Sequence, residues 1–276
     1  MEQLKIADTS ALVLNWTLTD VWQTETARHY VEHLDLSEAD RLLALFNEQE
    51  RQMHTQCVTG RKFFMRKCAL SFIEKYQQQQ QSPQIIILAA GIAPLSVELT
   101  ALFPQIKIFD VDRDLMAEKE KMLRDQFSNI QFLTCDISNL ENLTQQLVDN
   151  GWNHLRPTLV ILEGIIYYLK EEDLKNILHY FAENHADLAC DFALESECVA
   201  MPNRTFGIEV FRKIEAATGI PKVRFYTPEY FMEMLKNCGY QNIQLQTSAA
   251  IQIERTGKAV PFEDSHSSWI NFIQTS

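Results

Sequence analysis

Continuous apolar runs alternate with amphipathic stretches in the middle of the chain, and this alternation predicts the fold. The first run, Gln84–Leu88, is rich in β-branched residues, which is typical of a strand buried on both faces of a parallel sheet. Similar strands are expected over 106–112, 130–136, 158–162 and 186–194, with amphipathic helices over 95–103, 113–127, 140–148 and 171–184. Such alternation predicts an α/β fold with a doubly wound, mostly parallel sheet.

The two flanks of this region have different patterns. Residues 1–81 are largely helical by periodicity and predict an N-terminal helical cover. Residues 82–276 are expected to form the sheet domain, with a helical insertion at about 195–225, and the whole chain to form one structural unit. Thr227 and Pro228 begin a later helix that Gly239 ends. Polar-rich strands are expected over 241–247 and 250–255, and they predict an antiparallel C-terminal hairpin at the sheet edge.

Composition excludes several classes of partner. Lys and Arg number 25 against 37 Asp and Glu, a net charge of −12, whereas nucleic acids and anionic membranes are bound by clustered basic residues. The six cysteines form no C-x-x-C pair and no Cys/His spacing suited to zinc, so we expect reduced thiols and no metal. The apolar run near the N-terminus is too short for a signal core or a membrane span. A cytoplasmic protein without a nucleic-acid or membrane partner is expected.

Small or acidic residues follow four of the predicted strands. In a doubly wound sheet the ligand crevice lies at the carboxyl ends of the central strands, so the loop from Ala89 to Gly91, Asp112, Asp136 and Glu163 are expected to meet there. A small loop allows close approach to a ligand, and Asp112 could bind the hydroxyls of a ribose. Asp136 could accept from the amine of adenine, and Glu163 could face a cationic group.

Each of these residues also has a purely structural interpretation. Ala-Ala-Gly after a strand can be a close-packing turn, and an Asp after a strand is often the N-cap of the next helix. A dinucleotide-binding site is disfavoured, because its G-x-G-x-x-G pattern would fall on Ala89, Gly91 and Pro94 with only one glycine present. Small or acidic residues follow four strands that end at the same edge of the sheet, and this combination favours an adenosyl ligand without phosphates.

The motifs at these strand ends resemble those of the leucine carboxyl methyltransferase family of class I S-adenosylmethionine-dependent O-methyltransferases. The similarity covers about residues 55–250 and runs through Q-I-I-I-L-A-A-G, I-F-D-V-D, T-C-D-I-S-N-L and L-V-I-L-E-G-I-I-Y-Y-L. The last of these, Glu163-Gly164 followed by Tyr168-Leu169, is the most specific, since it looks like the family's E-G-x-x-x-Y-L. The resemblance implies a seven-stranded sheet that ends in an antiparallel hairpin.

The resemblance also implies which residues bind S-adenosylmethionine. It places the cofactor-binding loop at Ala89 and Gly91 and the ribose-binding acid at Asp112. Asp136 and Ile137 would contact the adenine, and Glu163 would be the acid near the methionine amine. An arginine before the first strand, which binds the methionine carboxylate in the family, falls on Arg61, with Arg66 as the alternative. The family's G-x-G-x-D-T-R loop is not kept, because Ala93, Pro94 and Leu95 replace the polar residues.

The expected function is O-methylation of a carboxylate or hydroxyl on a small molecule. Two alternatives stay open: a protein that binds the cofactor without turnover, and carboxyl methylation of a protein C-terminus. No catalytic residue is assigned, since His54, His179 and His185 lie in helical segments without a matching acid. Tyr167 and Tyr168 either line the methyl-transfer pocket or are core aromatics. The N-terminal helices and residues 195–225 are expected to cover the pocket and to select the substrate.

Overall fold

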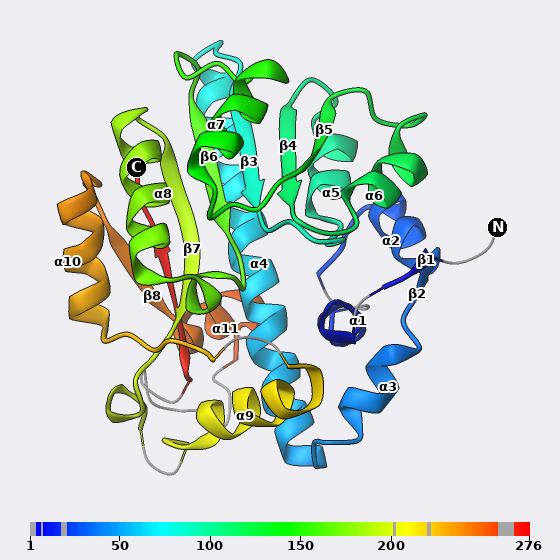
Figure 1. The fold of residues 1–276 in the computed structure, drawn as a ribbon, viewed down its shortest axis with the longest axis vertical. Helices are drawn as coiled ribbons and strands as arrows, with labels where there is room; N and C mark the ends of the chain where they lie inside the picture. Colours follow the sequence, from blue (N-terminus) through cyan, green and yellow to red (C-terminus); the bar gives the residue numbers. More distant parts are fainter. Residues whose placement is uncertain (1–3, 7, 18–20, 201–202, 220–221, 259–267) are drawn as a thin grey trace.

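The centre of the molecule is a seven-stranded sheet in the order β5-β4-β3-β6-β7-β9-β8 (Figure 1). The computed structural model describes residues 4–6, 8–17, 21–200, 203–219, 222–258 and 268–276. Strands β3 to β7 are parallel, and β9 is antiparallel to both of its neighbours. The strands are β3 (Gln84–Leu88), β4 (Lys107–Asp112), β5 (Ile130–Thr134), β6 (Thr158–Leu162), β7 (Asp187–Ala193), β8 (Gln244–Thr247) and β9 (Ile270–Gln274).

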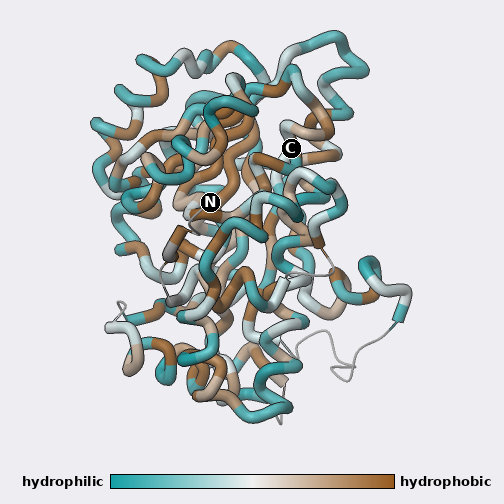
Figure 2. Tube along the Cα trace, turned by 90° about the vertical axis from the view of Figure 1, so that its right-hand side faces the viewer, coloured by the Kyte–Doolittle hydropathy of each residue, from teal (hydrophilic) through white to brown (hydrophobic). Residues whose placement is uncertain are grey.

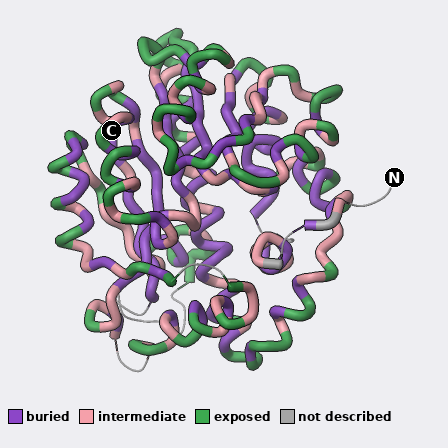
Figure 3. The backbone as a smooth tube through the Cα atoms, in the orientation of Figure 1, coloured by how far each residue is buried: buried purple, intermediate pink, exposed green. Residues whose placement is uncertain are grey.

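The two central strands are buried along their whole length. Every residue of β3 and β6 is buried, and Ile86 of β3 lies opposite Phe109 on one side and Val160 on the other. Figure 3 shows the strands as the buried centre of the molecule, with exposed residues mainly on the outer helices. This arrangement accounts for the unbroken apolar runs, because neither face of a central strand meets water.

Helices cover both faces of the sheet. Helices α4, α5 and α6 lie on one face and α7, α8 and α10 on the other (Figure 1), and in Figure 2 the hydrophobic segments gather between these layers. The bounds are α4 (Glu48–Gln78), α5 (Leu95–Leu102), α6 (Met116–Leu123), α7 (Leu140–Asp149), α8 (Glu171–Glu183) and α10 (Pro228–Cys238). The predicted doubly wound, mostly parallel α/β fold is therefore confirmed. The chain changes direction across the sheet between β3 and β6, which is where such folds bind ligands.

The N-terminal part is helical apart from a small parallel pair of strands, β1 (Leu4–Lys5) and β2 (Leu34–Asp35). Its helices are α1 (Asp8–Asn15), α2 (Glu25–Glu32), α3 (Glu38–Leu43) and α4 (Glu48–Gln78). A capping box formed by Asn47 and Glu50 begins α4, which runs along the sheet and buries Phe64, Met65 and Ile73 in the same core as the strands. The division of the chain at residue 81 stays a prediction.

The C-terminal part differs from the predicted hairpin in one strand. Residues 250–255 belong to helix α11 (Ser248–Thr256), and β8 pairs instead with β9. Six residues with alternating apolar positions fit a strand or a helix, but here Ile251 is fully buried while Ile253 is half exposed. The Thr247 side chain caps the first turn, and Gly257 ends the helix in a left-handed conformation.

Both helices predicted for the C-terminal part are present. The insertion contains α9 (Phe206–Thr218), and Thr227 caps α10 through the backbone N–H of Tyr230. Gly239 ends α10 with a φ of 107°. None of the helices in the described ranges combines the length and apolarity needed to cross a membrane.

Candidate functional site

The loop after β3 is held in place by residues of the neighbouring strand and helix. Ala89 and Gly91 have φ values of 56° and 50°, so the backbone turns sharply where β3 ends. The Asp112 carboxylate accepts the Gly91 N–H over 2.8 Å. The Lys119 ammonium donates to the carbonyls of Gly91 and Ala93 and pairs with Asp110 over 2.7 Å, with both of these charged side chains fully buried. The loop therefore keeps its shape without the polar residues that the family usually has.

One cavity of about 310 Å³ lies beside this loop, at the ends of β3, β4 and β5. Four of the predicted cofactor-binding residues line it: Ala89, Asp112, Asp136 and Ile137. Asp112 and Asp136 also accept the backbone N–H groups of Asp114 and Ser138, so both stabilise the turns that follow them. A carboxylate oxygen has two lone pairs, so these bonds leave acceptor capacity for a ligand.

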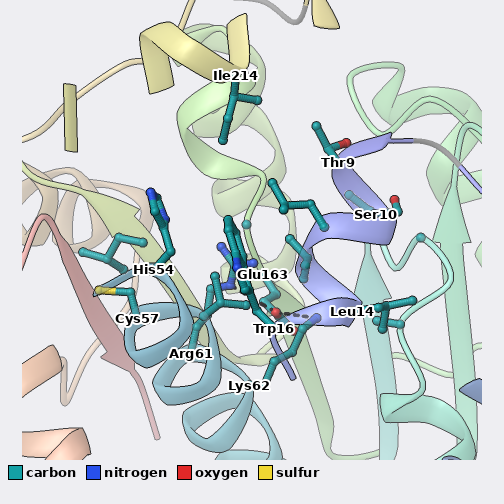
Figure 4. A pocket seen from close by; sticks show the side chains of 18 of the residues that line it. Thr9, Ser10, Leu14, Trp16, His54, Cys57, Arg61, Lys62, Glu163 and Ile214 are labelled. Atoms are coloured by element: carbon teal, nitrogen blue, oxygen red, sulfur yellow. Dashed lines mark hydrogen bonds and ion pairs between the residues drawn. The ribbon is translucent and has the colours of Figure 1, made fainter. Parts of the chain in front are cut away.

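A second cavity of about 230 Å³ lies next to the first, and Ala89 and Tyr168 line both. Its wall combines α1, α4 and α9 with the loop after β3 and the turn after β6 (Figure 4). The predicted residues Arg61, Gly91, Glu163 and Tyr167 line this cavity. Residues of α1 and of α9 in the insertion line this cavity, while it stays a prediction that these parts cover the active site and select the substrate.

A cluster of four buried charges lies at the second cavity, and three of its members, Arg61, Lys62 and Glu163, line it. Lys62 Nζ lies 2.6 Å and Arg61 Nε lies 3.2 Å from Glu163 Oε1 (Figure 4 shows these side chains converging). Arg61 also donates to the Tyr167 hydroxyl over 3.1 Å and lies 3.8 Å from Asp191 Oδ2. No more than 8% of any of these four charged side chains is exposed, so the two cations and two carboxylates balance each other in a site with little water.

The ionisation of this cluster follows from burial and pairing. Burial alone would raise the pKa of Glu163, but the charges of Lys62 and Arg61 hold this pKa below its ordinary value. Burial raises the pKa of Asp191 to about 6, despite the attraction of Arg61. Burial also raises the pKa of Tyr167 well above its ordinary value and that of Tyr168 to about 12. The tyrosines are therefore neutral hydroxyl groups at neutral pH and can donate hydrogen bonds.

The geometry distinguishes the two arginine candidates. Arg61 lines the second cavity, whereas Arg66 donates to Glu98 over 2.9 Å and to Gln23 over 3.1 Å. Glu98 in turn accepts the backbone N–H groups of Gln23 and Thr24, so Arg66 helps to attach the start of α2 to α5. Arg61 is the arginine in position to meet a ligand, although binding by it stays a prediction.

Sequence reasoning missed several residues of the site. Lys62 directly follows Arg61, and a Lys beside the chosen Arg in a helix that packs on the sheet could have pointed to it. Asp191 is a carboxylate in the fully buried part of strand β7, which is the usual sign of a buried partner. His54 and Trp16 line the second cavity, and no sequence signal places these two side chains together.

The residues present fit an adenosyl cofactor. An added Cβ at Gly91 would meet no atom within 4 Å, so the space above the loop is open. Carboxylates suited to ribose and adenine line the first cavity, and groups of both charges suited to an amino-acid moiety line the second. Among the described residues no group of three or more His, Cys, Asp or Glu side chains has the geometry of a metal site.

Solved structures with a similar fold are mainly methyltransferases. A DUF574 family protein from Streptomyces avermitilis has a TM-score of 0.63 at 13% identity, with 96% of each chain covered. A candidate methyltransferase from Thermobifida fusca has a TM-score of 0.64 at 13% identity, with 99% of this chain and 95% of that chain covered. A candidate O-methyltransferase from Nostoc punctiforme has a TM-score of 0.50 at 13% identity, covering 91% and 72%. These likenesses support the fold.

The sequence itself identifies the family. No curated protein matches the chain, but the family model for leucine carboxyl methyltransferase matches residues 12–182. This match begins earlier than the similarity seen in the motifs and covers more than half of the chain. The family uses S-adenosylmethionine, in agreement with the cofactor predicted from the sequence. The chain belongs to the leucine carboxyl methyltransferase family.

Proposed function

We propose that this protein is an S-adenosylmethionine-dependent O-methyltransferase that acts on a small carboxylic acid. One observation carries the proposal: two cavities meet at Ala89 and Tyr168, and their chemistry differs. The first presents Asp112 and Asp136, which suit an adenosine. The second presents the cluster around Glu163, which suits a zwitterionic amino acid.

The residues named for the cofactor divide between the two cavities. Asp112 would accept from the ribose hydroxyls and Asp136 from the adenine amine, with Ile137 packed against the base. Arg61 would pair with the methionine carboxylate, and Glu163 would face the ammonium. When bound, S-adenosylmethionine would supply a methyl group already activated by a sulfonium.

Charge balance favours a carboxylate acceptor over a hydroxyl. Arg61 and Lys62 are already balanced by Glu163 and Asp191, so a cationic ligand leaves a positive charge that an anionic oxygen would neutralise. A hydroxyl would need a base, but Glu163 is held by two cations, and burial lowers the pKa of His54 to about 3. A carboxylate needs no proton removed. Tyr167 and Tyr168 can donate hydrogen bonds that orient it.

The size of the second cavity favours a small acceptor over a protein C-terminus. Helices α1 and α9 both contribute to its wall, and at about 230 Å³ it is small even before a cofactor moiety is accommodated. The net charge of −12 supports a function without nucleic acid or membrane partners. Six free cysteines, five of them buried, support a reducing, cytoplasmic location.

Calorimetry and a transfer assay test the proposal together. We expect S-adenosylhomocysteine to bind and NADH not to bind, and radiolabelled S-adenosylmethionine to transfer its methyl group to a small apolar acid as a base-labile ester. Binding without transfer to any of a broad set of acids and alcohols would favour the non-catalytic alternative. Absence of S-adenosylhomocysteine binding would contradict the proposal itself.

A further inference from the structure

The second cavity has two chemically different ends. Its charged side chains, Arg61, Lys62 and Glu163, contact one another and form one part of its wall. We call the remaining part the apolar half and define it by six lining residues from α4, α9 and the region of α1: Leu12, Trp16, His54, Val58, Phe211 and Ile214. In Figure 4, Ile214 lies at the top of the view and Lys62 at the bottom, with His54 to the left between them. No Asp, Glu, Lys or Arg side chain belongs to this half among the described lining residues.

His54 is enclosed by aromatic rings. The Trp16 ring lies parallel to the imidazole at a centroid distance of 4.8 Å, and the rings of Phe46, Trp269 and Phe206 lie 5.0, 5.4 and 5.7 Å away. Burial lowers the pKa of His54 to about 3, because this effect and the nearby Lys213 outweigh the attraction of Glu50. At neutral pH the imidazole is uncharged, so it can offer a hydrogen bond but no charge.

Two polar atoms of the apolar half lack partners. His54 Nε2 and Trp16 Nε1 are both buried, and neither has a hydrogen-bond partner within the described protein atoms. Buried polar atoms in folded proteins are nearly always paired, so each exception calls for a missing partner. Both atoms belong to side chains that line the same cavity and stack on one another. A ligand with one uncharged polar group could satisfy this site.

The helix sets the distance between this site and the charged cluster. His54 and Arg61 are seven residues apart on α4, which places them on one face of the helix about 10 Å apart along its axis at roughly 1.5 Å per residue. Cys57 and Val58 lie between them on the same face and also line the cavity. Two turns of α4 therefore set the distance between His54 and the charged cluster, and this distance limits the length of the methyl acceptor.

We propose that the apolar half binds the body of the methyl acceptor, an elongated apolar or aromatic acid whose far end carries an uncharged hydrogen-bonding group paired with His54. A cation at that end would lack a free carboxylate, because Glu50 is paired with Lys213 beside the Phe46 ring. An anion there would lack a free counter-charge, since Lys213 pairs with Glu50 over 2.6 Å. This inference rests on the proposed function, and it makes His54 a specificity-determining residue.

A pair of probe acids that differ only in the far polar group tests the inference. We would measure the binding of 3-phenylpropanoate and 3-(4-hydroxyphenyl)propanoate by calorimetry in the presence of S-adenosylhomocysteine. The hydroxylated acid is expected to bind about fivefold to tenfold more tightly to the wild type, the effect of one neutral hydrogen bond. In His54→Phe this preference should fall below twofold, while the affinity for S-adenosylhomocysteine stays unchanged.

Controls separate the possible causes. His179→Phe changes a histidine of α8 whose side chain is 58% exposed, and it should keep the full preference. Trp16→Phe keeps an aromatic ring, although a smaller one, and loses the indole N–H; it provides a second test if His54→Phe does not fold, and the preference should fall in this variant as well. Equal binding of the two acids to the wild type would overturn the inference, and so would an unchanged preference in His54→Phe. If S-adenosylhomocysteine does not bind, the proposed function fails, whereas a His54-dependent preference between the acids would still support the subsite.

Discussion

Gly91 donates its backbone N–H to the Asp112 carboxylate over 2.8 Å and so joins the loop after β3 to the end of β4. Asp112 therefore holds the loop in place and, in our proposal, also accepts hydrogen bonds from the ribose hydroxyls. Asp112→Ala should weaken binding of S-adenosylhomocysteine at least tenfold, as loss of a charged hydrogen bond implies. Calorimetry checks this, with Asp114→Ala as the control because Asp114 is exposed two residues further on. An affinity equal to that of the wild type would reject the ribose assignment.

The buried ion pair between Lys62 and Glu163 should contribute far more to the free energy of unfolding than an exposed ion pair made by another lysine of α4. Lys62→Met leaves the buried Glu163 with Arg61 alone, and loss of one partner of a buried pair costs on the order of 3 kcal/mol. The control is Lys67→Met, which removes a partly exposed pair with Glu254 worth less than about 1 kcal/mol. Urea denaturation measures both free energies of unfolding. Similar losses in the two variants would show that the cluster adds little to stability.

Gly164 should be required for the position of Arg61. Its φ is 69°, and a Cβ there would lie 3.1 Å from Arg61 Nη1. Gly219 has the same φ but no atom within 4 Å of an added Cβ, so the two Gly→Ala variants share the backbone cost of about 1 kcal/mol or more and differ in the contact. We expect only Gly164→Ala to weaken S-adenosylhomocysteine binding, by several-fold in calorimetry. Equal affinities in both variants would contradict a role of Arg61 in binding.

Stability should depend on pH through His54. Its pKa is about 3 in the folded state and about 6.5 when unfolded, so the unfolded chain binds more protons as the pH falls below 6.5. The folded state should lose about 2 kcal/mol from this group between neutral pH and pH 5. His54→Phe should lose correspondingly less over the same range. Denaturation curves at pH 7 and pH 5 test this, and the two proteins would show equal losses if the imidazole were protonated when folded.

The local pattern predicted the sheet well, and its failures have a physical reason. The fully buried strands β3 and β6 stand out because every residue is apolar or shielded. Residues 250–255 were assigned wrongly, since two isoleucines two positions apart do not distinguish strand from helix until Ile251 packs inward and Ile253 faces outward. The hydroxyl of Thr247 fits a turn as well as the start of a helix, so it does not decide between them.

The site was only partly predictable, for a different reason. Asp112 and Asp136 follow strands directly, so topology alone brings them to one edge of the sheet. The contact of Lys62 with Glu163 and the stack of Trp16 on His54 join elements that are distant in sequence. Such contacts depend on how α4 and the region of α1 pack against the sheet, and no local spacing specifies that.

The loop after β3 has one further consequence. Its described anchors all use main-chain groups: Asp112 accepts the Gly91 N–H, Lys119 donates to the Gly91 and Ala93 carbonyls, and the Tyr30 hydroxyl donates to the Ile92 carbonyl over 3.1 Å. The conformation of the loop is therefore held by side chains outside it, on α2, β4 and α6. Within the loop, the left-handed backbone at Ala89 and Gly91 limits which residues are tolerated, and in our proposal the side chains that recognise the cofactor lie outside it.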